Sequence, residues 1–586
     1  MIMKHFFRTH RIAIFLAVIV GLITGLPTIL TPVILGSAYH GIPFLPLSDE
    51  YHYLARIQDI LDGHWSGGST FLYEYKNLPS AVWPVNEALY AIPAFVFGIM
   101  PVVIASKFVL PAALFFLSYL FLLGVFKRED SSAQITAIAG ALFIALGAEF
   151  VNYAYMSRVL TGGQIPIESL WTRLINPIVG AVQMTGFLIF LWKIWERGWR
   201  YSYIAAGIIL ASMIGYFFSF SLSLAILGTL FIFAFVRGER DIAKKFFLIG
   251  VISFVIDSPW WYTMIMSLGG TAGRLIATQN GMAFTHIPVL NKAVLVSTVL
   301  FALFFFYDRF YRNDLGNTRK WLFGLSLIVG CWIAFNQQVI TGREVWYPHF
   351  VQYTVPLSVL ALFIAGYMAL HRHRLPWRVA MYALSAAILC YGLFSLTSVD
   401  NVYDLKYLAY IQPRAAFLMW FRDNAPKDCV VLVNANDPDH EEEERFIPAF
   451  SSCNSYVADD PVLSVTPERA EYDYLLRLQM MSMDTSHVRD YLMTQEGDVR
   501  GNFYADFAQA FGKGMDPWII EKIDVLTEEY KDFVKTGLET HIMKYRADYI
   551  LSQGPLSARL LRALPDLELV ASTGSYDIYD FRKDMR

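Results

Sequence analysis

Long apolar runs separated by short charged segments fill the first two thirds of the chain. Windows of about 19 residues, the length that crosses a bilayer as a helix, indicate eleven candidate spans. These spans lie at 12–35, 108–126, 132–149, 178–194, 202–216, 219–236, 246–263, 292–307, 320–336, 350–370 and 378–397. The pattern predicts a polytopic α-helical membrane protein whose transmembrane region covers residues 1–398.

The stretch 88–106 is also apolar, but Pro93 and Pro101 interrupt it. Proline removes a backbone donor and bends or ends a helix from inside. We therefore predict that this stretch lies along the outer membrane interface as a helix. It would close a first outer loop that spans residues 36–107.

The distribution of Lys and Arg predicts the orientation, because these residues concentrate in cytoplasmic loops. Alternate loops are rich in them: Lys127-Arg128, Lys193/Arg197/Arg200, Arg237/Arg240/Lys244/Lys245, Arg309/Arg312/Arg319/Lys320 and Arg372/Arg374/Arg378. The loops between them carry fewer: Arg56/Lys76/Lys107, Arg158/Arg173, Arg274 and Arg343. The N-terminus is therefore predicted in the cytoplasm. Its apolar segment runs past Pro32 without a clear cleavage site, which predicts a retained anchor.

From residue 399 onward the composition changes to that of a soluble domain. Residues 430–433 and 549–551 read as buried strands, and 567–581 as a hairpin around Gly574. Helical patterns occupy 466–485 and 518–547. We predict an extracytoplasmic α/β domain over residues 399–586, large enough for its own core.

Composition supports the membrane class and excludes several others. The chain has 55% hydrophobic and 17% charged residues, against roughly 45–50% and 25% in soluble domains. A net charge of −3, with no basic stretch that interleaves aromatic residues, gives no support for nucleic-acid binding. The absence of CxxC, HExxH and Walker patterns gives none for a zinc enzyme or a nucleotide hydrolase.

The four cysteines fall into two classes. Cys331 and Cys390 lie in predicted spans and read as small apolar residues. Cys429 and Cys453 both lie in the predicted outer domain, where oxidising conditions permit a disulfide. The sequence leaves their pairing open.

The first candidate for chemistry is the acidic pair Asp49-Glu50, which follows the first span on its outer side. Charge near lipid is costly and tends to mark chemistry or transport. The structural alternative is a helix start, since Ser48 is a good N-cap and the helix dipole favours acids in the first turn. The residues that follow show helical spacing of Leu54, Ile57 and Leu61, which predicts an amphipathic helix at the interface.

The second outer loop carries Arg158 and Arg173 beyond Glu149, against the positive-inside bias. A guanidinium group binds phosphate through two parallel hydrogen bonds, so both arginines are candidates for a phosphate site. The alternative is that they snorkel to lipid headgroups.

Two further outer positions complete the candidates. Asp257 precedes Pro259 and an aromatic pair, where it either pairs with one of the arginines or takes part in catalysis. The short loop 336–349 is dense in hydrogen-bonding side chains that would lie near the membrane surface. Its candidates for binding a sugar or phosphate are Arg343 and His349, with Gln338 and Glu344 as candidates for support.

The order of these features resembles a family. An N-terminus inside, a long first outer loop that opens with Asp49-Glu50, a proline-containing helix before the second span, Tyr155-Met156-Ser157-Arg158 after the third and a terminal outer domain are similar to the GT-C glycosyltransferases. That superfamily includes the protein O-mannosyltransferases and the lipid A aminoarabinose transferase. The resemblance covers the membrane region, and its sharpest motif is Asp49-Glu50. Where the mannosyltransferases carry a second acid soon after Ser-Arg, this chain has Thr161-Gly162-Gly163.

The resemblance implies transfer of a sugar from a polyprenyl-phosphate donor to a lipid, polysaccharide or protein acceptor. It implies Asp49 as general base and Glu50 as its orienting partner or a sugar contact. Arg158, Arg173 and Arg343 would bind the departing phosphate, and His349 the sugar or phosphate. Glu149, Asp257, Gln338 and Glu344 would support them. Related oligosaccharyltransferases use a divalent metal such as Mg²⁺ or Mn²⁺, but the first loop contains no Asp-x-Asp, so the metal stays open.

Three other classes of protein fit the sequence less well. A secondary transporter would place ionisable or broken-helix positions near the membrane centre, usually in repeated halves, and no repeat is evident. An O-antigen-ligase-like polymer transferase would carry its large outer loop between late spans. An envelope scaffold would work through its soluble tail, and the outer arginines argue against it only weakly.

Overall fold

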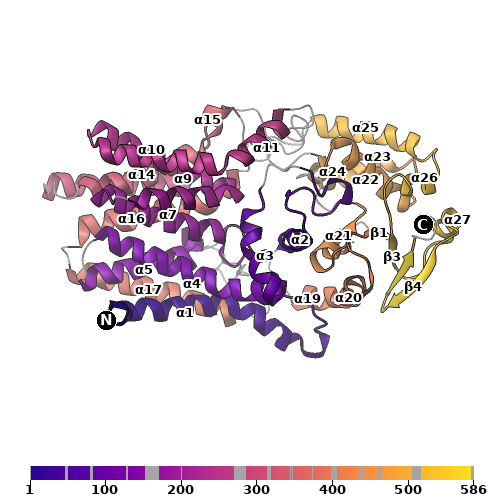
Figure 1. The fold of residues 1–586 in the computed structure, drawn as a ribbon, viewed down its shortest axis with the longest axis horizontal. Helices are drawn as coiled ribbons and strands as arrows, with labels where there is room; N and C mark the ends of the chain where they lie inside the picture. The colour runs from indigo at the N-terminus through magenta and orange to yellow at the C-terminus, as the bar shows by residue number, and fades with distance from the viewer. Residues whose placement is uncertain are drawn as a thin grey trace.

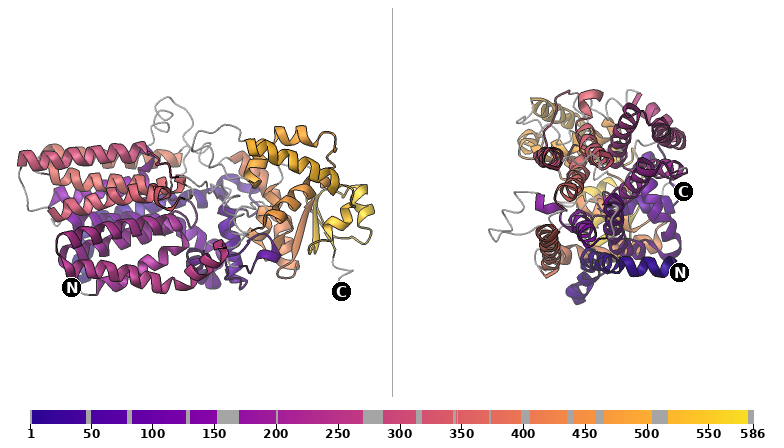
Figure 2. Two further views of the ribbon diagram at one scale, coloured as in Figure 1. Left: turned by 90° about the horizontal axis from the view of Figure 1, so that it is seen from above. Right: turned by 90° about the vertical axis from the view of Figure 1, so that its left-hand side faces the viewer.

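The computed structural model describes residues 2–45, 50–78, 83–126, 130–151, 170–199, 201–269, 286–312, 318–342, 345, 347–371, 374–397, 405–434, 441–457, 465–503 and 517–581. A helical bundle and a C-terminal domain lie side by side along the long axis (Figure 1). The bundle runs from α1 (Ile2–Leu35) to α17 (Arg374–Thr397), and the C-terminal domain begins at α19 (Leu405–Ile411). The start of α1 and the C-terminal domain occupy opposite ends of the molecule (Figure 2).

Eight helices of the described residues are long and apolar enough to cross a membrane, so the chain is a multi-pass membrane protein. Besides α1 and α17, the bundle contains α4 (Ile99–Phe126), α5 (Ser131–Leu146), α7 (Ile178–Arg197), α8 (Ser202–Ser212), α9 (Phe217–Val236), α10 (Arg240–Ile256), α11 (Ser258–Gly269), α13 (Lys292–Tyr307), α14 (Thr318–Phe335), α15 (Gln338–Thr341) and α16 (Tyr347–Leu370). Each predicted span coincides with helical structure. The predicted segment 246–263, however, is divided between α10 and α11 at Asp257, because Pro259 fits only the first turn of a new helix.

The apolar stretch 88–106 is divided as well. α3 (Val85–Phe97) ends at Gly98, whose φ of 81° is open to glycine and strained for other residues. α4 then begins at Ile99 and includes Pro101 in its first turn, where the missing N–H costs nothing. The single interfacial helix predicted here is therefore two helices, and the second continues into the membrane.

α1 and α4 pack closely through two glycines spaced four residues apart. A Cβ atom on Gly21 would lie 2.6 Å from the carbonyl oxygen of Phe108, and one on Gly25 would lie 2.4 Å from the Phe108 ring. The Thr24 hydroxyl between them donates to the Lys107 carbonyl at 2.9 Å. Small residues at this spacing let two membrane helices approach closely.

The loops predicted as cytoplasmic meet at one end of the bundle, called here the N-terminal end. Lys245 Nζ donates to the Gly198 carbonyl at 2.6 Å, and Lys320 Nζ to the Phe126 carbonyl at 3.2 Å. Arg319 pairs with Glu239 at 2.9 Å. The opposite end, called the loop end, faces the C-terminal domain (Figure 1).

The C-terminal domain is built on a five-stranded sheet of order β2-β1-β3-β5-β4. Its strands are β1 (Val430–Asn434), β2 (Asn454–Ser455), β3 (Tyr549–Gln553), β4 (Glu568–Thr573) and β5 (Tyr576–Asp580). β1 is parallel to β2 and β3 and wholly buried, as its run of valines predicts. β4 and β5 form the predicted hairpin, with Gly574 at φ 66° in the turn.

The domain also contains the helices α20 (Ala415–Asn424), α21 (Glu441–Phe450), α22 (Pro467–Met480), α23 (Val488–Thr494), α24 (Glu496–Phe503), α25 (Pro517–Phe533), α26 (Leu538–Ile542) and α27 (Ala558–Ala563). The predicted helix 518–547 is two helices, since Gly537 caps the second. Cys429 and Cys453 form a disulfide. In the charged first turn of α21, Glu443 is buried and pairs with Arg414 at 2.8 Å.

We expect Gly21→Ala to lower the thermal unfolding temperature of the purified protein, because the new methyl group meets backbone of α4 that cannot rotate away. Gly250→Ala in α10 is the matched control. Its methyl group would meet nothing within 4 Å, and alanine is the better helix former by about 1 kcal/mol. Equal unfolding temperatures for the two variants would contradict the close α1–α4 contact.

Candidate active site

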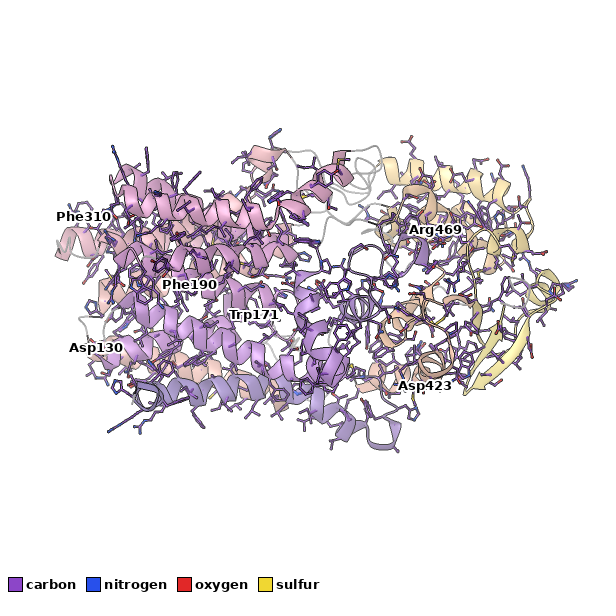
Figure 3. The ribbon with its side chains drawn as sticks, viewed as in Figure 1. Asp130, Trp171, Phe190, Phe310, Asp423 and Arg469 are labelled. Carbon is purple, nitrogen blue, oxygen red and sulfur yellow. A yellow bond between two sulfur atoms is a disulfide. The ribbon has the colours of Figure 1, made fainter. Side chains whose placement is uncertain are left out.

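The candidate site lies at the loop end of the bundle, where α2 (Glu50–Leu61) and α3 meet the segment 170–177 before α7. Figure 3 marks this region by Trp171, between Asp130 at the N-terminal end and Arg469 in the C-terminal domain. Helix α2 begins directly after the predicted base Asp49, which itself lies outside the described residues.

Glu50 is completely buried and forms an ion pair with a lysine of the bundle. Its Oε2 atom lies 2.5 Å from Lys107 Nζ, and the lysine side chain is 3% exposed. The same oxygen accepts a hydrogen bond from the Leu174 amide at 3.1 Å, and Lys107 also donates to the Thr172 carbonyl. The first residue of α2 is thereby fixed to α4 and to the segment 170–177.

The segment 170–177 is held from its other side as well. The Tyr353 hydroxyl of α16 donates to the Pro177 carbonyl at 2.8 Å, and Trp171 Nε1 donates to the Ile144 carbonyl at 2.5 Å. Ile175 has φ of 60°, a conformation that is strained for a β-branched residue. Such strain persists only where surrounding contacts enforce it, and it concentrates at functional sites.

Polar side chains from five elements converge beside this segment. We call them the polar cluster, and its members are Tyr53, Arg56, Asn86, Glu87, Arg173, Asn176, Tyr216, His349 and Tyr353. Arg56 pairs with the fully buried Glu87 at 3.1 Å, and Asn86 Nδ2 donates to Asn176 Oδ1 at 3.0 Å. The Tyr216 ring lies 5.9 Å from that of Tyr353 and 6.4 Å from that of His349.

The positive charge of Arg173 lies close enough to interact electrostatically with Tyr216, Tyr353 and His349. Burial lowers the pKa of Arg173, but a guanidinium stays protonated in proteins. Burial raises the pKa of the Tyr53 and Tyr216 phenols, so both keep their protons as hydrogen-bond donors. The cluster therefore combines a half-buried positive charge with neutral hydroxyl and amide groups.

The structure describes only some of the predicted site residues, and it brings only some of those together. Asp49, Arg158, Arg343 and Glu344 lie outside the described residues, as does the side chain of Glu149 in the short helix Ala148–Val151. Arg173 and His349 come together in the polar cluster, although 176 positions separate them in the sequence. Glu50 lies at its edge, paired with Lys107.

Asp257 and Gln338 have local structural partners. The Asp257 carboxylate accepts a hydrogen bond from the Ser253 hydroxyl at 2.9 Å and forms no ion pair with any described arginine. Gln338 Nε2 donates to the Ile287 carbonyl at 3.2 Å. Both contacts hold turns between helices, so the pairing of Asp257 with an arginine does not occur within the described part of the chain.

Several members of the site were missed from the sequence. In the sequence, Arg56 and Lys107 were used only among the basic residues that predict the membrane orientation. Asn86 and Glu87 were not assigned a role. A signal was present: Lys107 lies within the strongly apolar helix α4, and Asn86 and Glu87 lie in the first turn of α3. Charged or amide groups on such helices need buried partners, which sequence spacing does not identify.

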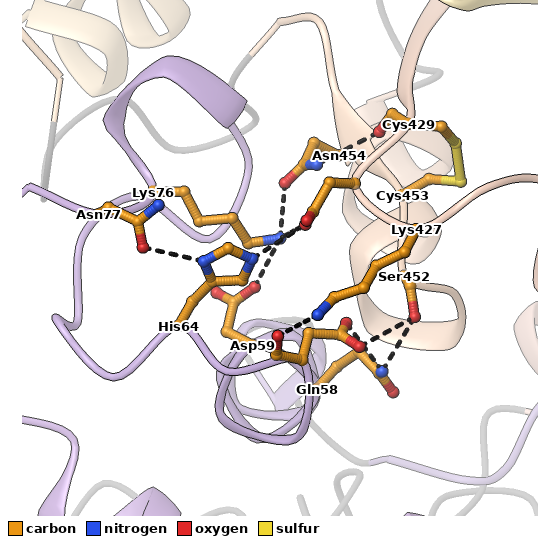
Figure 4. Close-up of polar contacts among 12 residues, drawn as sticks. Gln58, Asp59, His64, Lys76, Asn77, Lys427, Cys429, Ser452, Cys453 and Asn454 are labelled. Carbon is orange, nitrogen blue, oxygen red and sulfur yellow. Dashed lines mark hydrogen bonds and ion pairs between the residues drawn. A yellow bond between two sulfur atoms is a disulfide. The ribbon is translucent and has the colours of Figure 1, made fainter.

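A second polar group joins the first loop to the C-terminal domain (Figure 4). We call it the interdomain latch and define it by Asp59, His64, Lys76, Asp428 and Asn454. Lys76 Nζ is buried 2.8 Å from Asp59 Oδ1 and 2.7 Å from Asn454 Oδ1. The ring nitrogens of His64 lie 2.9 Å from Asp428 Oδ1 and 2.9 Å from Asn77 Oδ1.

The latch continues into apolar packing and into the disulfide. The Asn454 side chain donates to the carbonyl of Cys429, which is bonded to Cys453. Tyr51 of α2 packs against Phe446 of α21 with ring centroids 4.5 Å apart. Leu54 and Ile57 are fully buried, so the apolar face predicted for a membrane interface is covered by protein.

Within the described residues no group of three or more His, Cys, Asp or Glu side chains could hold a metal ion. The interdomain latch contains two carboxylates, but Lys76 lies between them. The polar cluster contains the single carboxylate of Glu87, which Arg56 occupies.

No protein-family model and no curated protein sequence matches the chain. Solved structures similar to it include the archaeal oligosaccharyltransferase AglB from Archaeoglobus fulgidus in complex with an inhibitory peptide and a dolichol-phosphate. That match has 13% identity and a TM-score of 0.46, and covers 93% of this chain and 69% of that one. ArnT from Cupriavidus metallidurans bound to undecaprenyl phosphate matches with 12% identity and a TM-score of 0.41, covering 95% and 97%. Both are GT-C superfamily members. Similarity at this level carries no argument about the reaction, which rests on the residues of this chain.

We expect Lys107→Met to destabilise the protein strongly, by about 3–5 kcal/mol, because it leaves the buried Glu50 charge without its cation. Combining it with Glu50→Gln should recover much of that loss. Thermal unfolding in detergent measures both variants. Lys535→Met, which removes a pair with Asp532 on an exposed helix, is the control and should change little. An equal loss in the single and double variants would contradict the coupling.

The latch predicts a specific pH dependence. Burial raises the pKa of the Asp59 carboxyl from 3.8 to about 6, against the lowering effect of Lys76 and His64 and with the raising effect of Asp62. The folded protein therefore holds this proton more tightly than the unfolded chain, and the stability from it is lost as pH rises from about 4 to above 6. The stability of Asp59→Asn relative to wild type should therefore rise as the pH increases from about 4 to above 6. The measurement is the difference in unfolding temperature between the two proteins at several pH values. A constant difference would contradict the raised pKa.

Proposed function

We propose that this chain is a GT-C type glycosyltransferase that moves a sugar from a polyprenyl-phosphate donor to a hydroxyl acceptor at the loop end of the bundle. The observation that carries the proposal is the convergence of Arg173 and His349 with the tyrosines and amides of the polar cluster. This cluster lies beside Glu50, the residue that follows the predicted base.

The cluster has the groups that such a reaction requires. Transfer breaks the bond between the anomeric carbon and a phosphate oxygen, so negative charge grows on the departing polyprenyl phosphate. A guanidinium in a poorly solvated site stabilises that charge, and Arg173 is the described residue of that kind. Protonated tyrosine hydroxyls and the Asn86 and Asn176 amides can hold the neutral hydroxyls of a sugar.

The acceptor hydroxyl would lose its proton to Asp49 as its oxygen attacks the anomeric carbon. A positioned carboxylate in this role contributes about 10²–10⁴-fold. Glu50 acts as a positioning residue in this proposal, because its carboxylate binds Lys107 and the Leu174 amide. Arg158 and Arg343 remain candidates for the phosphate.

The proposed reaction takes place at the surface of a membrane. The donor's prenyl chain would lie in lipid beside the bundle, and the acceptor would be a lipid, a polysaccharide or a protein. The protein would reside in the inner (plasma) membrane, with its N-terminus in the cytoplasm and its C-terminal domain outside. A divalent metal is not required by any described residue, and Mg²⁺ or Mn²⁺ dependence is a variable of the assay.

The test is a transfer assay with purified protein, a panel of radiolabelled polyprenyl-phosphate sugars and membrane extract as acceptor, with and without divalent metal. We expect Asp49→Asn to lower turnover by about 10²–10⁴-fold, because the acceptor loses its base. Arg173→Gln should lower kcat/KM by about 10²–10³-fold, because the leaving phosphate loses its cation.

Matched controls separate these effects from loss of structure. Asp566→Asn and Arg422→Gln change the same residue types at exposed positions of the C-terminal domain and should keep wild-type turnover. Full activity of Asp49→Asn would exclude Asp49 as the base. A wild-type protein that neither binds nor turns over any prenyl-linked donor would overturn the proposal and favour transport.

A further inference from the structure

At the N-terminal end of the bundle, opposite the polar cluster, a pocket of about 280 Å³ opens between α1, α4 and α5. Its lining includes Arg8, Arg11, Tyr119 and Gln134. The N label in Figures 1 and 2 marks this end of the molecule. We call it the N-terminal pocket, and the function proposed above does not use it.

The pocket carries positive charge that the described protein does not neutralise. Arg8 and Arg11 are three positions apart on α1, so they project from one face of the helix. Both residues are exposed, and neither forms an ion pair with any acidic residue in the described part of the chain. Two guanidinium groups at the rim of one pocket match the oxygens of a phosphate group.

Neutral donors lie deeper in the same pocket. Tyr119 of α4 is buried, with its hydroxyl 3.0 Å from His10 Nδ1, and this contact ties α1 to α4 at the base of the pocket. The half-buried amide of Gln134 comes from α5. The Tyr119 hydroxyl and the Gln134 amide can form hydrogen bonds with the ester and hydroxyl oxygens next to a lipid phosphate, which an apolar ligand lacks.

The surface next to the pocket is apolar and open to lipid. Phe7, Ile12 and Phe15 of α1 are 54%, 57% and 65% exposed. α1 is long and apolar enough to cross the membrane, so these side chains continue from the pocket toward the hydrocarbon layer. A ligand with a phosphate headgroup and acyl chains could contact both surfaces at once.

We propose that the N-terminal pocket binds the phosphate headgroup of an anionic glycerophospholipid from the adjacent leaflet. Arg8 and Arg11 hold the phosphate oxygens, Tyr119 and Gln134 contact the glycerol region, and the acyl chains lie along the exposed face of α1. The bound lipid fixes α1 against α4 and α5 at the end of the bundle remote from the candidate active site.

The test is native mass spectrometry of the full-length protein, titrated in detergent with phosphatidylglycerol, with phosphatidylcholine or with inorganic phosphate. The wild type should retain phosphatidylglycerol in preference to phosphatidylcholine. A basic residue at a membrane surface contributes about 1 kcal/mol, roughly fivefold in affinity, so the double variant Arg8→Gln/Arg11→Gln should bind about thirtyfold more weakly.

Arg240→Gln/Lys244→Gln is the matched control, because it removes the same charge from exposed positions of α10 at the same end of the bundle. It should retain phosphatidylglycerol as the wild type does, and unfolding temperatures should show that both double variants are folded. Equal losses in the two double variants would overturn the proposal, since general charge would explain the binding. Displacement of the lipid by inorganic phosphate at equal concentration would overturn it as well, because the site would then take a soluble anion.

Discussion

The buried ion pair between Glu50 and Lys107 is the contact on which the candidate site depends. It joins the start of α2 to α4, and through the Leu174 amide and the Thr172 carbonyl it also fixes the segment before α7. Two charges removed from water interact strongly only when their geometry and remaining hydrogen bonds are good, and removal of one leaves the other uncompensated. The predicted base precedes Glu50 directly, so the orientation of α2 governs where that base can act.

The same loop is held a second time by the C-terminal domain. Helix α2 contacts the domain through the edge-to-face pair of Tyr51 and Phe446 and through the interdomain latch, where buried Lys76 binds groups from both sides. The C-terminal domain therefore packs against the loop that carries the candidate chemistry. The bundle and the first loop supply the members of the polar cluster, and the C-terminal domain holds that loop in place.

The helical layout was largely predictable. Hydropathy is a local property, so each predicted span coincides with helical structure, and the buried strand at 430–433 and the hairpin at Gly574 follow from equally local patterns. The breaks were harder to place. The stretch 88–106 is interrupted at Gly98, whereas Pro93 lies inside α3 and Pro101 in the first turn of α4. The chain also turns at Asp257, inside what read as one span. The disulfide between Cys429 and Cys453 was left open because pairing depends on distance in space.

The sequence by itself determined the class of the protein, the positions of its membrane helices and the presence of acids and arginines on the loops of one side. Tertiary structure alone decided which of these groups meet. Glu50 finds Lys107 across 57 positions and Lys76 finds Asn454 across 378, and nothing in either residue's neighbourhood identifies its partner. A buried charge needs a compensating group, but the energy of that requirement depends on distance and burial, which exist only once the helices have packed.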